Sequence, residues 1–223
     1  DTLFISCFDG SHAFLFKALL KDNKMSEGIF ISGIHWQEPW VAFRNEKAEL
    51  SNPDSLTFLK KGFDKISFSF PDLDSAIISL SDKKFQNKVV IIKIMGSWCP
   101  NCLDETVFLS ELYKNEHEKG LEIIGLSFER SPDFGKARQV VKRFKEQLNA
   151  PYDFLIAGTA SAAKANEALP MLNRVMSFPT TIFIDRSGKV RKIYTGFYGP
   201  GTGEYYEKYK EEMEEFVQRL QKE

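Results

Sequence analysis

The stretch that decides the fold reads Gly96-Ser97-Trp98-Cys99-Pro100-Asn101-Cys102. It follows a continuous apolar run, Val89–Met95, which predicts a buried strand, and it precedes a stretch typical of a helix, from about Pro100 to about His117. This context gives the Cys-x-x-Cys spacing its meaning, because the predicted helix begins at the first cysteine.

The two cysteines of this stretch have different predicted roles. Cys99 falls at the N-cap of the helix, and Pro100 takes the first helical position, where a missing N–H costs nothing. Free backbone N–H groups and the positive end of the helix dipole stabilise a thiolate on Cys99, which is the species that attacks a disulfide. Cys102 lies one turn further on and can resolve the mixed disulfide. The motif therefore predicts thiol–disulfide exchange.

Strand and helix patterns alternate outward from the motif. The downstream pattern predicts a strand at Leu121–Phe128, a helix through Phe134 and Leu148, and a strand pair on either side of Arg186-Ser187-Gly188. A final helix from about Glu204 carries apolar residues on one face. We therefore predict an α/β fold, a mixed central sheet flanked by helices.

The motifs resemble a known family. A strand followed by Trp-Cys-x-x-Cys and a helix, with Phe178-Pro179-Thr180 far downstream, resembles thioredoxin, and the segment SFPTTIFIDRSGKV (177–190) resembles the TlpA/ResA-like branch. The resemblance covers roughly residues 70–223. It implies that Pro179 is cis and lies against the cysteines, and that the backbone of Phe178 pairs with the substrate. Trp98 is expected to contact the substrate beside Cys99.

Three residues are predicted to tune the thiols. Glu105 matches an acidic position that tunes the thiols in ResA-like proteins. Pro100 follows the first cysteine, whereas the family commonly places proline before the second. Lys93 occupies the position of a buried aspartate in thioredoxins, and a cation there would lower the pKa of Cys99. The alternative is that Lys93 reaches solvent or pairs with a local acid.

The part of the chain before the motif is predicted to be β-rich. Phe14, Phe16, Ala18 and Leu20 alternate along one face of a strand, and turn residues separate further short strands, which favours an antiparallel meander. Turn chemistry near Phe70 places the boundary there: residues 1–70 form a β-rich segment or partial domain, and residues 71–223 a thioredoxin-like domain. Cys7 falls in an apolar strand pattern and is expected to be a buried, inert thiol.

Composition and cysteine count narrow the function. A net charge of −1 over 223 residues indicates neither nucleic-acid binding nor a polybasic membrane patch. Zinc normally takes four ligands, and His12, His35 and His117 are scattered, so no metal or other cofactor is expected. We read the chain, which starts at Asp1, as mature or trimmed, so that an export signal or lipid anchor would be lost from view. The resemblance implies an extracytoplasmic, periplasmic or membrane-anchored protein that acts on protein disulfides and receives electrons from a membrane donor. We expect it to be a monomer.

Two other functions are alternatives. A peroxiredoxin-type peroxidase requires Thr three residues before its reactive cysteine, and Gly96 at that position disfavours this function. Alternatively, the β-rich segment is a docking module and the thioredoxin-like domain a non-enzymatic scaffold. A further hypothesis concerns the turn-rich segment 196–203, which in thioredoxin-like folds flanks the cysteines; Tyr198 and Thr202 would then contact the substrate.

Overall fold

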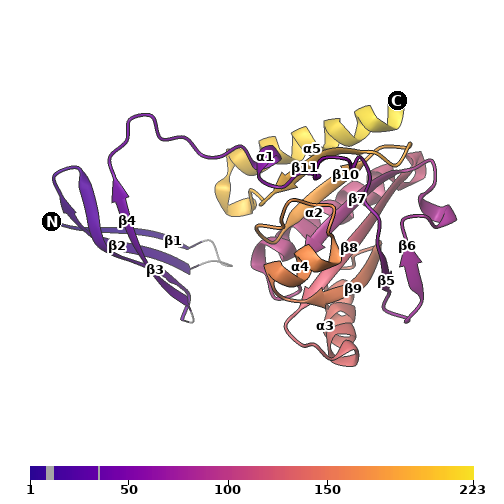
Figure 1. Ribbon diagram of the computed structural model, residues 1–223, viewed down its shortest axis with the longest axis horizontal. Helices are drawn as coiled ribbons and strands as arrows, with labels where there is room; N and C mark the ends of the chain where they lie inside the picture. Colours follow the sequence, from indigo (N-terminus) through magenta and orange to yellow (C-terminus); the bar gives the residue numbers. More distant parts are fainter. Residues whose placement is uncertain (9–12, 35) are drawn as a thin grey trace. The chain divides into compact units, whose positions relative to one another are not determined.

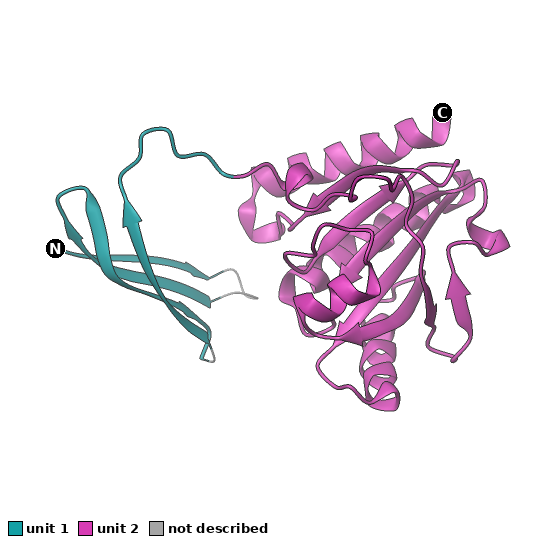
Figure 2. Cartoon of the chain, viewed as in Figure 1, with its two compact units in different colours: residues 1–50 teal, residues 51–223 magenta. Residues whose placement is uncertain are grey.

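The computed structural model describes residues 1–8, 13–34 and 36–223, which form two compact units, residues 1–50 and 51–223 (Figures 1 and 2). The first unit is a four-stranded antiparallel sheet in the order β1-β2-β3-β4. Its strands are β1 (Thr2–Phe8), β2 (Ala13–Lys21), β3 (Lys24–Ser32) and β4 (Trp36–Phe43). The predicted antiparallel meander is therefore present.

Very little of the first unit is buried. Among its described residues only Ala18 and Gly28 are buried. Aromatic rings nevertheless pack on one face: the ring centroid of Phe30 lies 5.6 Å from that of Phe14 and 4.6 Å from that of Phe16. Cys7, which we expected to be buried, is exposed. The reason is that β1 is an edge strand and that a single sheet contains no second layer to cover it.

The second unit is built on a five-stranded mixed sheet in the order β11-β10-β7-β8-β9. Strands β7 (Val89–Met95), β8 (Leu121–Glu129) and β9 (Asp153–Thr159) are parallel, whereas β10 (Thr180–Ile184) runs antiparallel to both β7 and β11 (Val190–Thr195). All seven residues of β7 are buried, because this central strand is covered on both faces.

Helices cover both faces of this sheet (Figure 1). One face packs against α2 (Pro100–Glu116), α3 (Phe134–Gln147) and α5 (Glu204–Lys222). The first two share a face because successive right-handed crossovers lead outward from β7 to β8 and then β9. The other face packs against α4 (Ala162–Ala168) and the chain before β7. That chain contains α1 (Pro53–Leu56), β5 (Ser69–Pro71), β6 (Ile77–Ser79) and the short helix η1 (Lys83–Phe85). Two further single turns are η2 (His117–Lys119) and η3 (Pro200–Thr202).

The boundary between the units lies after Leu50, whereas the sequence had suggested residue 70. The intervening segment is bonded into the second unit: the Lys60 amide donates to Met171 O at 2.8 Å, and the Asn173 amide donates to Phe58 O at 2.8 Å. The turn residue Asn52 caps α1 by accepting from the Asp54 amide at 2.9 Å. The later turn signal at Phe70 belongs to the small β5–β6 hairpin. Within the described part of the chain, no helix is both long enough and apolar enough to cross a membrane.

Candidate active site

The cysteine pair lies where β7 ends and α2 begins. Cys99 is the N-cap of α2, Pro100 is its first residue, and the Cys99 sulfur accepts a hydrogen bond from the Cys102 amide at 3.3 Å. Both cysteines are free thiols, with Cys99 7% exposed and Cys102 fully buried. The positions therefore match those derived from the motif.

The two thiols differ in acidity. The pKa of Cys99 lies below its ordinary value, chiefly because of its side-chain hydrogen bond with Cys102, with smaller contributions from the Cys102 amide and the charge of Lys93. Burial and the neighbouring Cys99 raise the pKa of Cys102 well above its ordinary value. Cys99 is thus the thiol that ionises first, as a nucleophile requires.

A proline loop faces Cys99. The Phe178–Pro179 peptide bond is cis, and the Cys99 sulfur lies 3.5 Å from Phe178 O. These residues meet because β10 runs antiparallel to β7, so that the start of one strand lies beside the end of the other. Trp98 packs edge-on against Phe178, with ring centroids 5.6 Å apart. Of the three residues that the sequence assigned to substrate binding, Trp98 and Phe178 thus pack against each other beside Cys99, and Pro179 follows Phe178 in the same loop.

A buried ion pair lies beside Cys102. Lys93 is fully buried and donates to Cys102 O at 2.5 Å and to the Thr106 hydroxyl at 2.7 Å. Its Nζ lies 3.4 Å from Glu105 Oε2, which is an ion pair without a hydrogen bond. Lys93 thus pairs with a local acid, the alternative left open by the sequence. Its charge also lowers the pKa of Cys99, as one of the smaller contributions.

Glu105 is held from two further elements. Its Oε1 accepts hydrogen bonds from the Thr181 hydroxyl of β10 at 2.7 Å and from the Tyr209 hydroxyl of α5 at 3.1 Å. Burial and the adjacent carboxylate raise the pKa of Tyr209 well above its ordinary value. The sequence indicated only that the final helix has one apolar face, because nothing in the local pattern around Tyr209 indicates a partner 104 residues away.

Glu129 is a second residue that sequence reasoning missed. It is the last residue of β8, and its carboxylate accepts from the Ser97 amide at 2.9 Å and the Ser97 hydroxyl at 2.7 Å. A single acid at the end of a strand forms no motif. The available signal was topological, because the carboxyl ends of adjacent parallel strands meet at one edge of a sheet.

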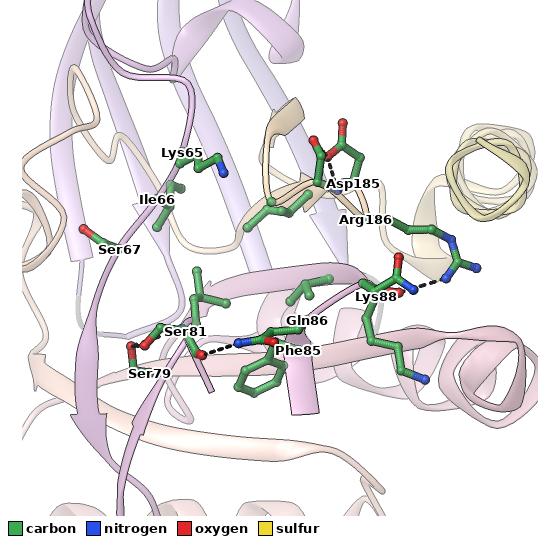
Figure 3. A pocket seen from close by; sticks show the side chains of 16 residues that line it. Lys65, Ile66, Ser67, Ser79, Ser81, Phe85, Gln86, Lys88, Asp185 and Arg186 are labelled. Carbon is green, nitrogen blue, oxygen red and sulfur yellow. Dashed lines mark hydrogen bonds between the residues drawn. The ribbon is translucent and has the colours of Figure 1, made fainter. Parts of the chain in front are cut away.

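Figure 3 shows a pocket of about 500 Å³. It lies at the end of the sheet opposite to the cysteines, since the cysteines follow the end of β7. It is lined by the start of β7 at Val90, the end of β10 at Ile184 and the side chains of Lys65, Gln86 and Arg186. Gln86 and Arg186 donate to backbone oxygens there. The dithiol is not part of this pocket. Among the described residues, which exclude His12 and His35, no group of three or more acidic, histidine or cysteine side chains is arranged to hold a metal ion.

Fold and site together define the class of this domain. Its mixed sheet carries a Cys-x-x-Cys dithiol at the start of a helix, and a proline loop faces the first sulfur. This arrangement is that of a thioredoxin-type oxidoreductase domain. Residues 61–208 match the Redoxin family model, and the chain belongs to the Redoxin family.

Relatives and solved structures agree with this assignment. The chain is 29% identical over 154 residues to thiol-disulfide oxidoreductase ResA of Bacillus thuringiensis subsp. konkukian, and the match covers 69% of this chain and 75% of ResA. It is 26% identical over 138 residues to ResA of Bacillus subtilis, and the match covers 62% of this chain and 69% of that ResA. A secreted thiol-disulfide isomerase from Corynebacterium glutamicum has the same fold, with a TM-score of 0.57 and 18% identity over 79% of this chain and 99% of the isomerase. The predicted fold and the predicted relationship to TlpA/ResA-like proteins are confirmed.

Proposed function

We propose that this protein is a thiol–disulfide oxidoreductase that reduces or exchanges protein disulfides through Cys99 and Cys102. One observation carries the proposal: the sulfur with the lowered pKa, Cys99, lies at the start of α2, accepts the Cys102 amide, and is the less buried of the pair. A nucleophile must be ionised and reachable, whereas a resolving thiol need only reach the first sulfur.

The reaction follows from these positions. The Cys99 thiolate attacks one sulfur of the substrate disulfide, which forms a mixed disulfide and releases the other substrate sulfur as a thiolate. Cys102 then loses its proton and attacks the Cys99 sulfur, which releases the second substrate thiolate. The enzyme dithiol is oxidised to a disulfide by two electrons, and the substrate is reduced to two thiols.

Three groups would assist this exchange. Trp98 and the Phe178–Pro179 loop are proposed to contact the polypeptide on either side of its disulfide, because Trp98 precedes Cys99 and packs against Phe178, whose carbonyl oxygen lies beside the Cys99 sulfur. Phe178 O accepts from the Cys99 thiol at 3.5 Å, and ionisation of Cys99 would release this backbone acceptor to an extended substrate chain. Lys93 and Glu105 are proposed to set thiol acidity, because their charges act on the pKa of Cys99 with opposite signs.

The cellular setting is also a proposal. We place the protein outside the cytoplasm, as a periplasmic or membrane-anchored monomer that a membrane donor keeps reduced. The resemblance to TlpA/ResA-like proteins supports this setting.

Insulin reduction with dithiothreitol tests the activity. Wild-type protein is expected to accelerate precipitation of the insulin B chain, and Cys99→Ser to fall to the rate of dithiothreitol alone. Cys102→Ser should instead accumulate mixed disulfides with its substrates, since the resolving thiol is absent. Cys7→Ser is the matched control and should retain full activity. A Cys99→Ser protein as active as the wild type would refute the proposal.

A further inference from the structure

The turn that carries the dithiol is anchored by the end of β8. The buried Glu129 carboxylate, 3% exposed, accepts three hydrogen bonds: from the Ser97 amide at 2.9 Å, the Ser97 hydroxyl at 2.7 Å and the Ser127 hydroxyl at 2.6 Å. Within the described residues no cationic side chain forms an ion pair with it. A carboxylate buried in this way is costly unless its oxygens are hydrogen-bonded, and here both are.

The two neighbours of Glu129 hold the next residue of the turn. The Trp98 indole N–H donates to Phe128 O at 2.9 Å, and the Arg130 guanidinium lies 5.5 Å from the centre of the Trp98 ring. The indole folds back so closely that a Cβ on Gly96 would lie 2.3 Å from its nitrogen. The last two residues of β8 and the residue that follows them therefore hold the turn from Gly96 to Trp98.

This turn determines where the Cys99 sulfur lies. The Cys99 amide donates to Gly96 O at 3.1 Å, so the turn closes directly onto the nucleophile. The sulfur must then both accept the Cys102 amide at 3.3 Å and face Phe178 O at 3.5 Å. Displacement of the turn would weaken the hydrogen bonds with Cys102 that are the main cause of the lowered Cys99 pKa.

We propose that Glu129 is a positioning residue for the dithiol, acting through Ser97 to hold Trp98 and Cys99 in the reactive arrangement. The role rests on the proposed disulfide exchange but concerns geometry, and it makes no use of the negative charge of Glu129. Charge and geometry can be separated, because a glutamine at this position could keep all three hydrogen bonds. Its oxygen would accept from the Ser97 amide and Ser127, and its amide would donate to the Ser97 hydroxyl, which can accept as well as donate.

The test compares Glu129→Ala, which removes the bonds, with Glu129→Gln, which removes only the charge. Iodoacetamide alkylation of Cys99 is followed against pH by mass spectrometry of its peptide, alongside insulin reduction. Glu129→Ala should move the Cys99 midpoint to higher pH and lower kcat/KM by roughly tenfold to a hundredfold, the effect of a small misplacement of a reacting group. Glu129→Gln should match the wild type in both measurements.

Glu122→Ala is the matched control, since it removes another carboxylate of the same strand, far from the cysteines, which accepts from Tyr113. It should leave both measurements unchanged. Equal effects of Glu129→Ala and Glu129→Gln would show a role of charge and overturn the proposal, as would an unchanged midpoint in Glu129→Ala.

Ser97→Ala decides the question if Glu129→Ala does not fold. It removes the Ser97 hydroxyl bond alone and should move the Cys99 midpoint in the same direction by a smaller amount; an unchanged midpoint would overturn the proposal. Absence of insulin reduction by the wild type would refute the proposed function, but the alkylation profile would still test Glu129.

Discussion

Two buried carboxylates lie near the cysteine pair, and they are stabilised in different ways. Glu105, on α2, is paired with Lys93 at 3.4 Å, and both charges act on the pKa of Cys99, with opposite signs. Glu129, on β8, takes three hydrogen bonds from two serines and, among the described residues, no ion pair. This difference separates the two proposed roles: charge is expected to act from the Glu105 side of the dithiol, and geometry from the Glu129 side. Substitutions on the Glu105 side should therefore move thiol acidity in a direction set by the sign of the charge removed.

The largest effect is expected from Lys93→Met. This variant leaves Glu105 buried without its cation, which should destabilise the reduced protein by about 3–5 kcal/mol. Because the charge of Lys93 lowers the pKa of Cys99, that pKa should rise. Urea unfolding measures the first effect and the pH profile of Cys99 alkylation the second. The double variant Lys93→Met/Glu105→Leu should recover most of the stability, and failure to do so would show that the pair is not the cause.

Glu105→Gln should move acidity the opposite way. The charge of Glu105 raises the pKa of Cys99, so its removal should shift the alkylation midpoint to lower pH. The glutamine oxygen can still accept from Thr181 and Tyr209, which limits the loss of packing. A shift in the same direction as that of Lys93→Met would contradict the comparison, because it would mean that the two variants act through disorder and not through charge.

The smallest effect is expected from Tyr209→Phe, which removes one of the two hydroxyls that donate to Glu105. The ring contacts remain, so the cost should be about 1.5 kcal/mol, the lower range for a hydrogen bond to a charged group. Tyr194→Phe is the matched control: its ring packs 5.2 Å from that of Tyr209, but its hydroxyl makes no hydrogen bond to Glu105 in the described structure. Thermal unfolding at pH 7 should separate the two variants, and equal losses would contradict the role of the Glu105 bond.

Much of the site was visible in the sequence because its parts are local. The apolar run 89–95, the proline after Cys99 and the Cys-x-x-Cys spacing lie within a short stretch, and together they fix a strand, a helix start and two thiols. The downstream segment around Phe178-Pro179 was found by resemblance. Lys93 was noticed as unusual, but its partner could not be chosen, since one residue does not show which acid it meets in the fold.

The parts that sequence reasoning missed depend on contacts between distant segments. Tyr209 reaches Glu105 only after α5 packs against α2, and Glu129 reaches Ser97 only because β8 pairs beside β7. The domain boundary differed for the same reason: residues 51–70 contain turn signals, but their backbone bonds to residues 171–173 place them in the second unit. The apolar strand pattern around Cys7 predicted burial, but Cys7 is exposed because its strand lies at the edge of a single-layered sheet.

The bond between α5 and Glu105 also has a consequence for biosynthesis. Tyr209 leaves the ribosome 104 residues after Glu105, which at ordinary translation speeds is a delay of roughly 5 to 20 s. During that interval the nascent chain already contains both cysteines, while the carboxylate lacks Tyr209 throughout and lacks Thr181 as well until 76 residues after Glu105. Any oxidant encountered in this window would meet both cysteines before the carboxylate near them has all its hydrogen bonds, so the order of synthesis leaves the dithiol for a time in an incomplete site.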